Sequence, residues 1–326
     1  MWDEDLIELT NKLLDIFLPY DRRERQRIKD TGKRFVHYTS AEAAVSIIEN
    51  QEIWLRNSNL MNDFSEIQHG EECWKYAWKA ESAGGRIKSV LRRLDETLLP
   101  EMEQQFADQF QSRFGEVYLL SLSEHEDHEN AHGRLSMWRA YGGNTNVALV
   151  LKTAPFMRVS TEVTAFSSKV LYTNPAEFVP YMAEVATLME QNYETLSSLT
   201  REALGVILSM AFHFAALSTK HPGFKEEQEW RVLYCPDTYP SSILSECEHI
   251  ACISGVPQKI YKVPLRDDPD RDYIGVNPED IIDCIIVGPT AFSKTVRDAL
   301  VAVLKRKGLR HAEEMVVVSD IPLRGR

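Results

Sequence analysis

Two glutamates, Glu227 and Glu229, have the spacing best suited to chemistry in this chain. They sit at the start of a strand-forming run that ends at Tyr234, and we expect both to lie within that strand. Side chains alternate along a strand, so residues two apart share a face. Two neighbouring carboxylates on a half-buried face repel each other unless cations neutralise them. The pair therefore indicates reaction chemistry, unless Arg231, predicted on the same face, neutralises it structurally.

A histidine near the start of the chain is the second candidate. His37, Tyr38 and Thr39 follow Arg34 in a short predicted strand, and Ser40 is a good helix cap. Helix N-termini attract phosphate, so a ligand beside His37 and Thr39 would lie near a favourable dipole. Alternation turns Tyr38 toward the core. A lone strand histidine also occurs as an ordinary core residue, and that alternative stays open.

Polar and aromatic residues in the middle of the chain complete the candidate site. Ser121 and Ser123 share one face of a predicted strand. Trp138 and Tyr141 lie three apart on a predicted helix and could cover a flat ring, or could simply be core. A polar loop followed by an acid could shape the rim of a pocket or contact a substrate, although Asn-Asp is also common turn chemistry; its residues are Asn62, Asp63 and Glu66.

A metal site is the competing chemical interpretation. His128 to His132 has the letters His-Glu-x-x-His, which on a helix would bind zinc with Glu129 as general base, and His125 lies nearby. The segment is polar throughout and Gly133 follows, so we expect a loop. No Asp, Glu or His occurs in residues 133–161 to supply the usual third ligand. The sequence therefore favours a reaction without a metal.

Composition narrows the class of protein. The chain has 326 residues, 44% of them hydrophobic, and a net charge of −12, which disfavours a broad nucleic-acid surface. Five irregularly spaced cysteines do not suggest a disulfide framework. No apolar run has transmembrane length and no basic leader opens the chain, so we expect a cytoplasmic protein without a membrane partner. A homo-oligomer is compatible with the sequence.

The elements that must position these residues indicate an α+β fold. An amphipathic helix and a basic connector occupy residues 1–33. Residues 34–326 are predicted to form one domain with a mixed or antiparallel sheet and helical insertions near 66–114 and 175–220. Strands scattered between helices of uneven length do not suit a doubly wound parallel sheet, and no glycine-rich phosphate loop is present.

Four sequence blocks resemble a bacterial family known as domain of unknown function 2971. The resemblance spans about residues 34–324, and the blocks occur in the family's order. They are His37 to Thr39 with Leu60 to Glu66, then Ser121 to Glu124 with Met137, Trp138 and Tyr141, then Phe224 to Arg231, and finally Ile285 to Pro289 with Ser319 to Arg324.

A more distant resemblance, to the ADP-ribosyltransferase superfamily, implies an activity. It rests on an early strand histidine, a central Ser-x-Ser and a late glutamate. It implies NAD as co-substrate and no metal, with Glu229 polarising the nicotinamide ribose and Glu227 orienting an unknown acceptor. The NAD-binding residues would be Arg34, His37, Tyr38, Thr39, Ser121, Ser123, Trp138 and Tyr141.

Such a domain would transfer ADP-ribose to protein, nucleic acid or a small molecule, or hydrolyse NAD, and could serve as a toxin or in defence against phage. Two alternatives stay open. One is a metal-dependent hydrolase or nuclease using His125, His128 and His132. The other is a module that binds a nucleotide or protein without turnover.

Overall fold

The computed structural model describes residues 4–60, 64–111, 117–141, 145–158 and 162–322. The chain forms two compact units, each built from segments that are distant in sequence. Unit 1 comprises residues 1–27, 59–117 and 168–225; unit 2 comprises residues 28–58, 118–167 and 226–326. Both predicted helical insertions and most of the N-terminal segment fall within unit 1.

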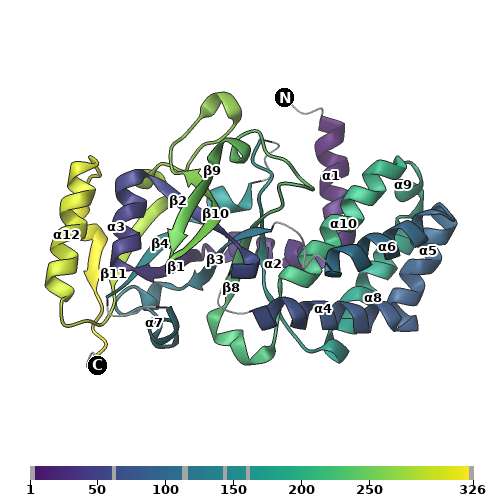
Figure 1. Ribbon diagram of the computed structural model, residues 1–326, viewed down its shortest axis with the longest axis horizontal. Helices are drawn as coiled ribbons and strands as arrows, with labels where there is room; N and C mark the ends of the chain where they lie inside the picture. Colours follow the sequence, from purple (N-terminus) through teal and green to yellow (C-terminus); the bar gives the residue numbers. More distant parts are fainter. Residues whose placement is uncertain (1–3, 61–63, 112–116, 142–144, 159–161, 323–326) are drawn as a thin grey trace. The chain divides into compact units, whose positions relative to one another are not determined.

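Unit 1 is a cluster of helices (Figure 1), and the rings of Trp74, Phe106 and Phe212 pack against one another inside it. A parallel pair of two-residue strands, β6 (Leu171–Tyr172) and β7 (Thr219–Lys220), accompanies the helices. Among the described residues no helix is long and apolar enough to cross a membrane. The helices are α1 (Glu4–Phe17), α2 (Pro19–Thr31), α4 (Phe64–Lys79), a π-helical turn (Glu81–Gly85), α5 (Arg86–Leu94), α6 (Leu98–Gln111), α8 (Pro175–Gln191), α9 (Tyr193–Ser197) and α10 (Arg201–Leu217).

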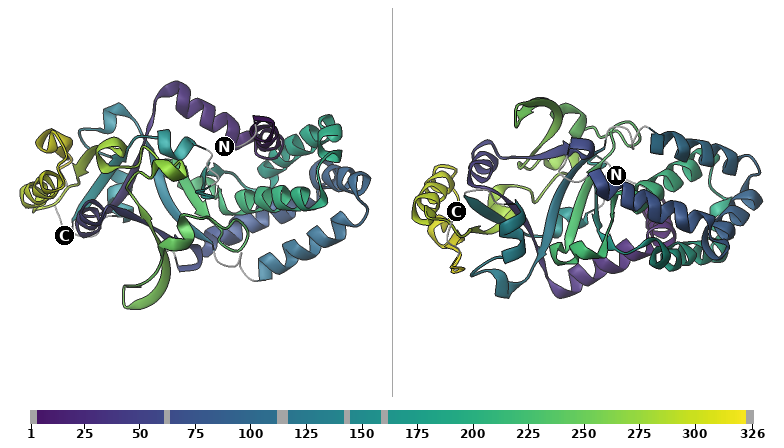
Figure 2. Two further views of the ribbon diagram at one scale, coloured as in Figure 1. Left: turned by 90° about the horizontal axis from the view of Figure 1, so that it is seen from above. Right: turned by 60° about the horizontal axis from the view of Figure 1, so that its bottom comes forward.

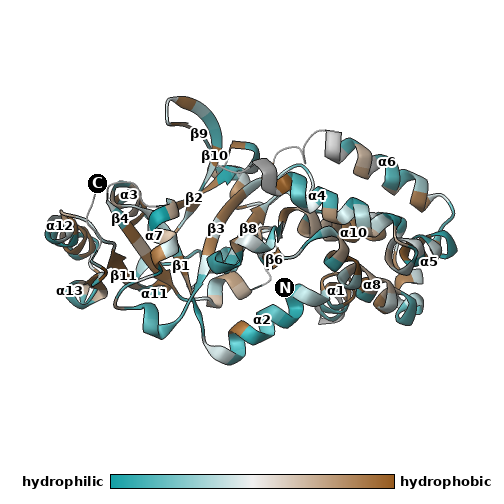
Figure 3. Cartoon of the chain, turned by 90° about the horizontal axis from the view of Figure 1, so that it is seen from below, coloured by the Kyte–Doolittle hydropathy of each residue, from teal (hydrophilic) through white to brown (hydrophobic). Residues whose placement is uncertain are grey.

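Two helical segments have details that the sequence prediction did not specify. The basic connector is helix α2, which is strongly hydrophilic (Figure 3) and carries internal ion pairs such as Arg25–Asp21 at 2.6 Å. Pairs four apart on a helix stabilise it despite its polar composition. The helical insertion predicted near residues 66–114 is interrupted at Asp95, whose carboxylate accepts the Thr97 N–H at 2.8 Å, and α6 begins at Leu98.

Unit 2 is built on a sheet of ten strands, with short helices between them. Most strands pair antiparallel, and β11–β12 is a parallel pair, so the expected mixed α+β class with a mostly antiparallel sheet is confirmed. The strands are β1 (Arg34–Ser40), β2 (Glu52–Asn57), β3 (Tyr118–His125), β4 (Asn146–Leu151), β5 (Phe166–Lys169), β8 (Glu229–Tyr234), β9 (Glu248–Ile253), β10 (Val256–Pro264), β11 (Ile282–Val287) and β12 (Val316–Val318).

The strand order is β12-β11-β4-β1-β3-β2-β10-β9, and β8 pairs with β3 and β5. Strand β3 therefore has three neighbours and occupies the centre of the sheet. The β9–β10 hairpin extends away from the other strands (Figure 2). Its two-residue turn, Ser254 and Gly255, has positive φ at both positions, as the right-handed twist of a hairpin favours.

Helices cover both faces of the sheet in unit 2. Helices α3 (Ala41–Asn50) and α12 (Ser293–Arg306) bury Ile48, Leu300 and other apolar side chains against the larger core, together with α11 (Pro278–Ile281) and α13 (Ala312–Met315). Helix α7 (Leu135–Tyr141) covers the other face over β11, β4 and β1. Ser40 caps α3 as predicted, accepting the Ala43 N–H at 3.1 Å.

Candidate functional site

The sheet of unit 2 splits along one edge of β3. Strand β1 pairs with Ser123 to His125 of β3, whereas β2 pairs with Tyr118 and Leu119. At about 3.3 Å per residue, roughly 13 Å of β3 separates Leu119 from Ser123. Strand β8 pairs along the opposite edge of β3 over six residues. The split therefore lies between β1 and β2, and β8 runs along the far edge of β3.

His37 lies at this split. Its Nδ1 is 3.2 Å from the backbone carbonyl oxygen of Ser121, so Nδ1 carries the proton and Nε2 keeps its lone pair. Burial lowers the pKa of His37, and the hydrogen bond to Ser121 offsets part of this effect. The ring remains half-buried rather than sealed. It is therefore a neutral imidazole with its position fixed and one acceptor nitrogen.

The two serines lie opposite the late acid and its neighbouring arginine on β3 and β8. Ser123 lies directly opposite Glu229 and Ser121 opposite Arg231, so all four side chains share one face. Arg231 holds Glu229 through Nε to Oε1 at 2.9 Å and Nη2 to Oε2 at 3.2 Å. Glu229 is 4% exposed, and this buried pair realises the structural role foreseen for Arg231. Alternation along β1 directs His37 to the opposite face.

The prediction that Glu227 shares the strand with Glu229 is wrong. Glu227 ends a 3₁₀ helix (Pro222–Glu227), and Gln228 has a φ of +46°. The strand begins only at Glu229, so the period-two argument does not reach Glu227. Glu227 is half-exposed and accepts a hydrogen bond from the Tyr141 hydroxyl at 3.0 Å. It is the more accessible of the two acids.

Tyr38 and Trp138 are engaged in packing. The Tyr38 hydroxyl accepts the Arg134 N–H at 2.8 Å, and burial raises the pKa of Tyr38 to about 12. Its ring meets Trp138 edge-on, with ring centres 4.8 Å apart. Trp138 donates its Nε1–H to the His132 carbonyl at 2.8 Å and is 3% exposed. Both rings belong to the core under α7, which leaves Tyr141 as the exposed aromatic of that helix.

The remaining candidates are an arginine, a threonine and the residues of the polar loop. Arg34 pairs with Asp283 and with Asp127, the latter at 2.6 Å, so its charge is compensated. Thr39 is half-buried on β1, on the side of His37. Asn62 and Asp63, and the side chain of Glu66, lie outside the described residues.

The three histidines differ in burial, and the ring centres of His128 and His132 lie 6.5 Å apart. His125 is fully buried and its Nε2 donates to the Asn130 side chain at 2.9 Å, while His128 is largely exposed. The segment is a 3₁₀ turn and loop, so the helix needed by a His-Glu-x-x-His site is not formed. Glu129 pairs with Arg134 at 3.0 Å. In the part of the chain that is described, no three His, Cys, Asp or Glu side chains are grouped to hold a metal ion.

Arg56 is a residue that sequence reasoning missed. It lies on β2 directly opposite Leu119, so its side chain shares a face with Ser121. Its Nε is buried without a hydrogen-bond partner among the residues described. Burial lowers the pKa of this guanidinium. Its chain neighbours, Leu55 and Asn57, give no local signal that could have identified it. A partly buried guanidinium whose Nε lacks a partner favours an anion beside it.

Residues 137–232, less than half of the chain, match the model of a family described as protein of unknown function DUF2971. The matched span runs from α7 into β8 and includes Tyr141, Glu227 and Glu229. The expected similarity to that family is confirmed over these residues. No curated protein and no solved structure matches the chain.

Proposed function

We propose that unit 2 binds NAD at the split in the sheet and transfers its ADP-ribosyl group to an acceptor or to water. The observation that carries this proposal is that Ser121, Glu229 and Arg56 share one face of the neighbouring strands β3, β8 and β2. The His37 ring, directed to the opposite face, is held at the split by the Ser121 carbonyl. Arg56 adds a cation at the β2 side of the split. A dinucleotide needs such groups: an acceptor for a ribose hydroxyl, a cation for its pyrophosphate and an acid near the second ribose.

The reaction breaks the bond between C1′ of the ribose and the nicotinamide nitrogen. The bonding electrons leave with the ring, which becomes neutral, and positive charge develops on the sugar. A nearby carboxylate stabilises this charge. Water or an acceptor hydroxyl then bonds to C1′ and loses its proton. We assign Glu229 to the developing charge, His37 Nε2 to a ribose hydroxyl and Arg56 to a phosphate.

The burial of Glu229 places a requirement on this mechanism. Because the carboxylate is only 4% exposed, binding must uncover it while Arg231 holds its orientation. Glu227 and Tyr141, hydrogen-bonded at 3.0 Å and accessible, are the pair we assign to the acceptor. A chain that consumes NAD or modifies a cellular component in this way would suit a toxin or a phage-defence effector.

The direct test is incubation of the full chain with labelled NAD, alone and with protein, RNA and DNA acceptors, in the presence and absence of EDTA. We expect EDTA-resistant release of nicotinamide or transfer of label. Glu229→Gln keeps the shape and hydrogen-bonding capacity of the side chain but removes its charge. We expect a loss of at least about 100-fold in rate, the scale typical of removing one charge-stabilising group.

The matched control is Glu226→Gln, the same change at an exposed neighbouring acid. His37→Ala should raise the NAD concentration needed for half-maximal rate, and circular dichroism should confirm that each variant is folded. Activity of folded Glu229→Gln equal to that of the parent chain would refute the assignment. EDTA-sensitive cleavage would support a hydrolase instead, and the absence of any NAD chemistry would support a binding module.

A further inference from the structure

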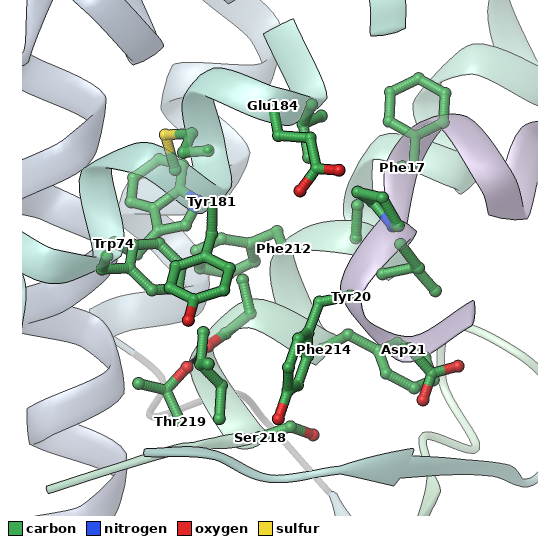
Figure 4. Close-up of a pocket in the computed structure, with 18 of the residues that line it drawn as sticks. Phe17, Tyr20, Asp21, Trp74, Tyr181, Glu184, Phe212, Phe214, Ser218 and Thr219 are labelled. Atoms are coloured by element: carbon green, nitrogen blue, oxygen red, sulfur yellow. Dashed lines mark hydrogen bonds between the residues drawn. The ribbon is translucent and has the colours of Figure 1, made fainter. Parts of the chain in front are cut away.

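Unit 1 contains an apolar cavity of about 140 Å³ lined by α1, α2, α4, α5, α6, α8 and α10 (Figure 4). Every residue that lines it belongs to unit 1. None of the NAD-site residues discussed above contributes to it. It is therefore a feature that the proposed activity of unit 2 does not use.

Aromatic rings form one wall of the cavity. Trp74 and Phe212 meet edge-on with ring centres 4.9 Å apart, and Phe106 stacks on Phe212 at 4.4 Å. Trp78 stacks on Trp74 at 4.9 Å behind them. Packed rings of this kind have few rotamers and hold their geometry, so the wall is preformed for a flat apolar guest.

The opposite end of the cavity carries hydroxyl groups. Figure 4 shows the hydroxyls of Tyr20, Tyr181, Ser218 and Thr219 gathered there, below the rings of Trp74 and Phe212. The Oγ of Ser218 is buried and has no hydrogen-bond partner within the described ranges. The residue is only 5% exposed. A buried hydroxyl without a partner is costly, and a ligand that pairs with it recovers that cost.

Both acidic side chains at the cavity are paired. Asp21 pairs with Arg25 at 2.6 Å, and Glu184 accepts two hydrogen bonds from Arg23, one of them at 3.0 Å. An ionic guest would have to compete with these partners and lose its hydration against aromatic walls. The chemistry of the cavity therefore suits a neutral molecule.

We propose that this cavity binds a small neutral aromatic molecule with one hydroxyl or N–H group, of the phenol or indole class. Its size supports a single ring system, because an apolar protein cavity of about 150 Å³ binds benzene. The ring lies against Trp74 and Phe212, and the polar group pairs with Ser218 Oγ. The proposal is independent of the reaction assigned to unit 2.

The test is titration of the full chain with phenol, indole and benzene, followed by ligand-observed NMR and calorimetry. We expect saturable binding, with phenol roughly 3- to 10-fold tighter than benzene, the ratio that one neutral hydrogen bond supplies. Ser218→Ala should remove this preference and leave benzene binding unchanged. Equal affinities of the parent chain for phenol and benzene would overturn the role given to Ser218.

Substitutions that fill the cavity test whether the probes bind inside it. Ala215→Leu adds a side chain at a lining position of α10, and Ala211→Leu does so one turn earlier if the first variant does not fold. Both should abolish binding of all three probes. Val206→Leu is the matched control, because Val206 is on the same helix but 51% exposed. No saturable binding to the parent chain, or unchanged binding in the filled variants, would overturn the proposal.

Discussion

At the scale of single residues, the buried pair of Glu229 and Arg231 combines the mutual attraction of two charges with the loss of their hydration. Each side chain is about 5% exposed, and the two charges neutralise each other within one strand. A buried pair of this kind contributes little net stability, because desolvation offsets most of the attraction. Removing one partner, in contrast, destabilises the fold, because it leaves the other charge buried without a counter-ion.

Arg231→Met is therefore expected to lower the free energy of unfolding by about 3–5 kcal/mol. The double variant Arg231→Met, Glu229→Met should recover most of this loss, because no buried charge remains. Denaturant unfolding followed by circular dichroism measures both. Lys294→Met, which breaks an exposed pair with Asp298 on α12, is the control and should leave the midpoint unchanged. A double variant no more stable than the single one would show that packing, not charge, dominates at this site.

At the scale of elements, helix α7 is positioned by Trp138. The ring packs on Tyr38, and two glycines approach it closely. A Cβ on Gly288 would lie 2.8 Å from Cβ of Asn146 and 2.9 Å from the Trp138 ring. A Cβ on Gly133, which has a φ of +68°, would lie 2.5 Å from that ring. The position of the Trp138 ring thus depends on the absence of a side chain at Gly133 and at Gly288.

Gly288→Ala is expected to destabilise unit 2 by about 1–3 kcal/mol, the usual cost of overpacking a closed site. The same substitution at Gly205 should act in the opposite direction. Gly205 lies inside α10 with no atom within 4 Å of a new Cβ, so alanine should stabilise by about 0.5–1 kcal/mol. Urea midpoints of the two variants provide the measurement. Equal midpoints would contradict the close approach to Trp138.

Local signals in the sequence identified elements better than they identified neighbours. The capping serine of α3 and the shared face of Ser121 and Ser123 follow from rules that act over a few residues. The start of β8 at Glu229 could not be predicted in this way, because glutamine at position 228 gives no strong signal for its left-handed backbone. The β9–β10 hairpin was missed although Ser254-Gly255 is a recognisable turn pair.

The pairing of strands and the packing of helices were harder to predict from the sequence than the elements themselves. The split in β3 depends on which strands pair with its two ends, and alternation alone cannot reveal those partners. Arg56 was overlooked for that reason, since its unpaired state appears only once its surroundings are known. The cavity of unit 1 likewise needs seven helices from three separate segments, and no single stretch of sequence encodes it.

At the scale of the whole molecule, both units bury histidines in their neutral form. Burial lowers the pKa of His213 in unit 1 to about 4, and it also lowers the pKa of His37 and His125 in unit 2. The unfolded chain binds a proton at each site below about pH 6.5, whereas the folded chain does not. Folding then excludes protons, so stability is complete above pH 6.5 and falls as the pH drops toward the folded pKa values.

We expect His213 alone to lower the free energy of unfolding of unit 1 by about 1–2 kcal/mol between pH 6.5 and pH 5, because the slope approaches 1.36 kcal/mol per pH unit only below pH 6.5. Carboxylates are still ionised in most of this window, which isolates the histidine effect. His213→Leu should flatten the dependence, whereas His249→Gln, at an exposed position of β9, should not change it. Urea unfolding at several pH values is the measurement. A slope in His213→Leu as steep as in the parent chain would show that other groups drive the acid sensitivity of unit 1.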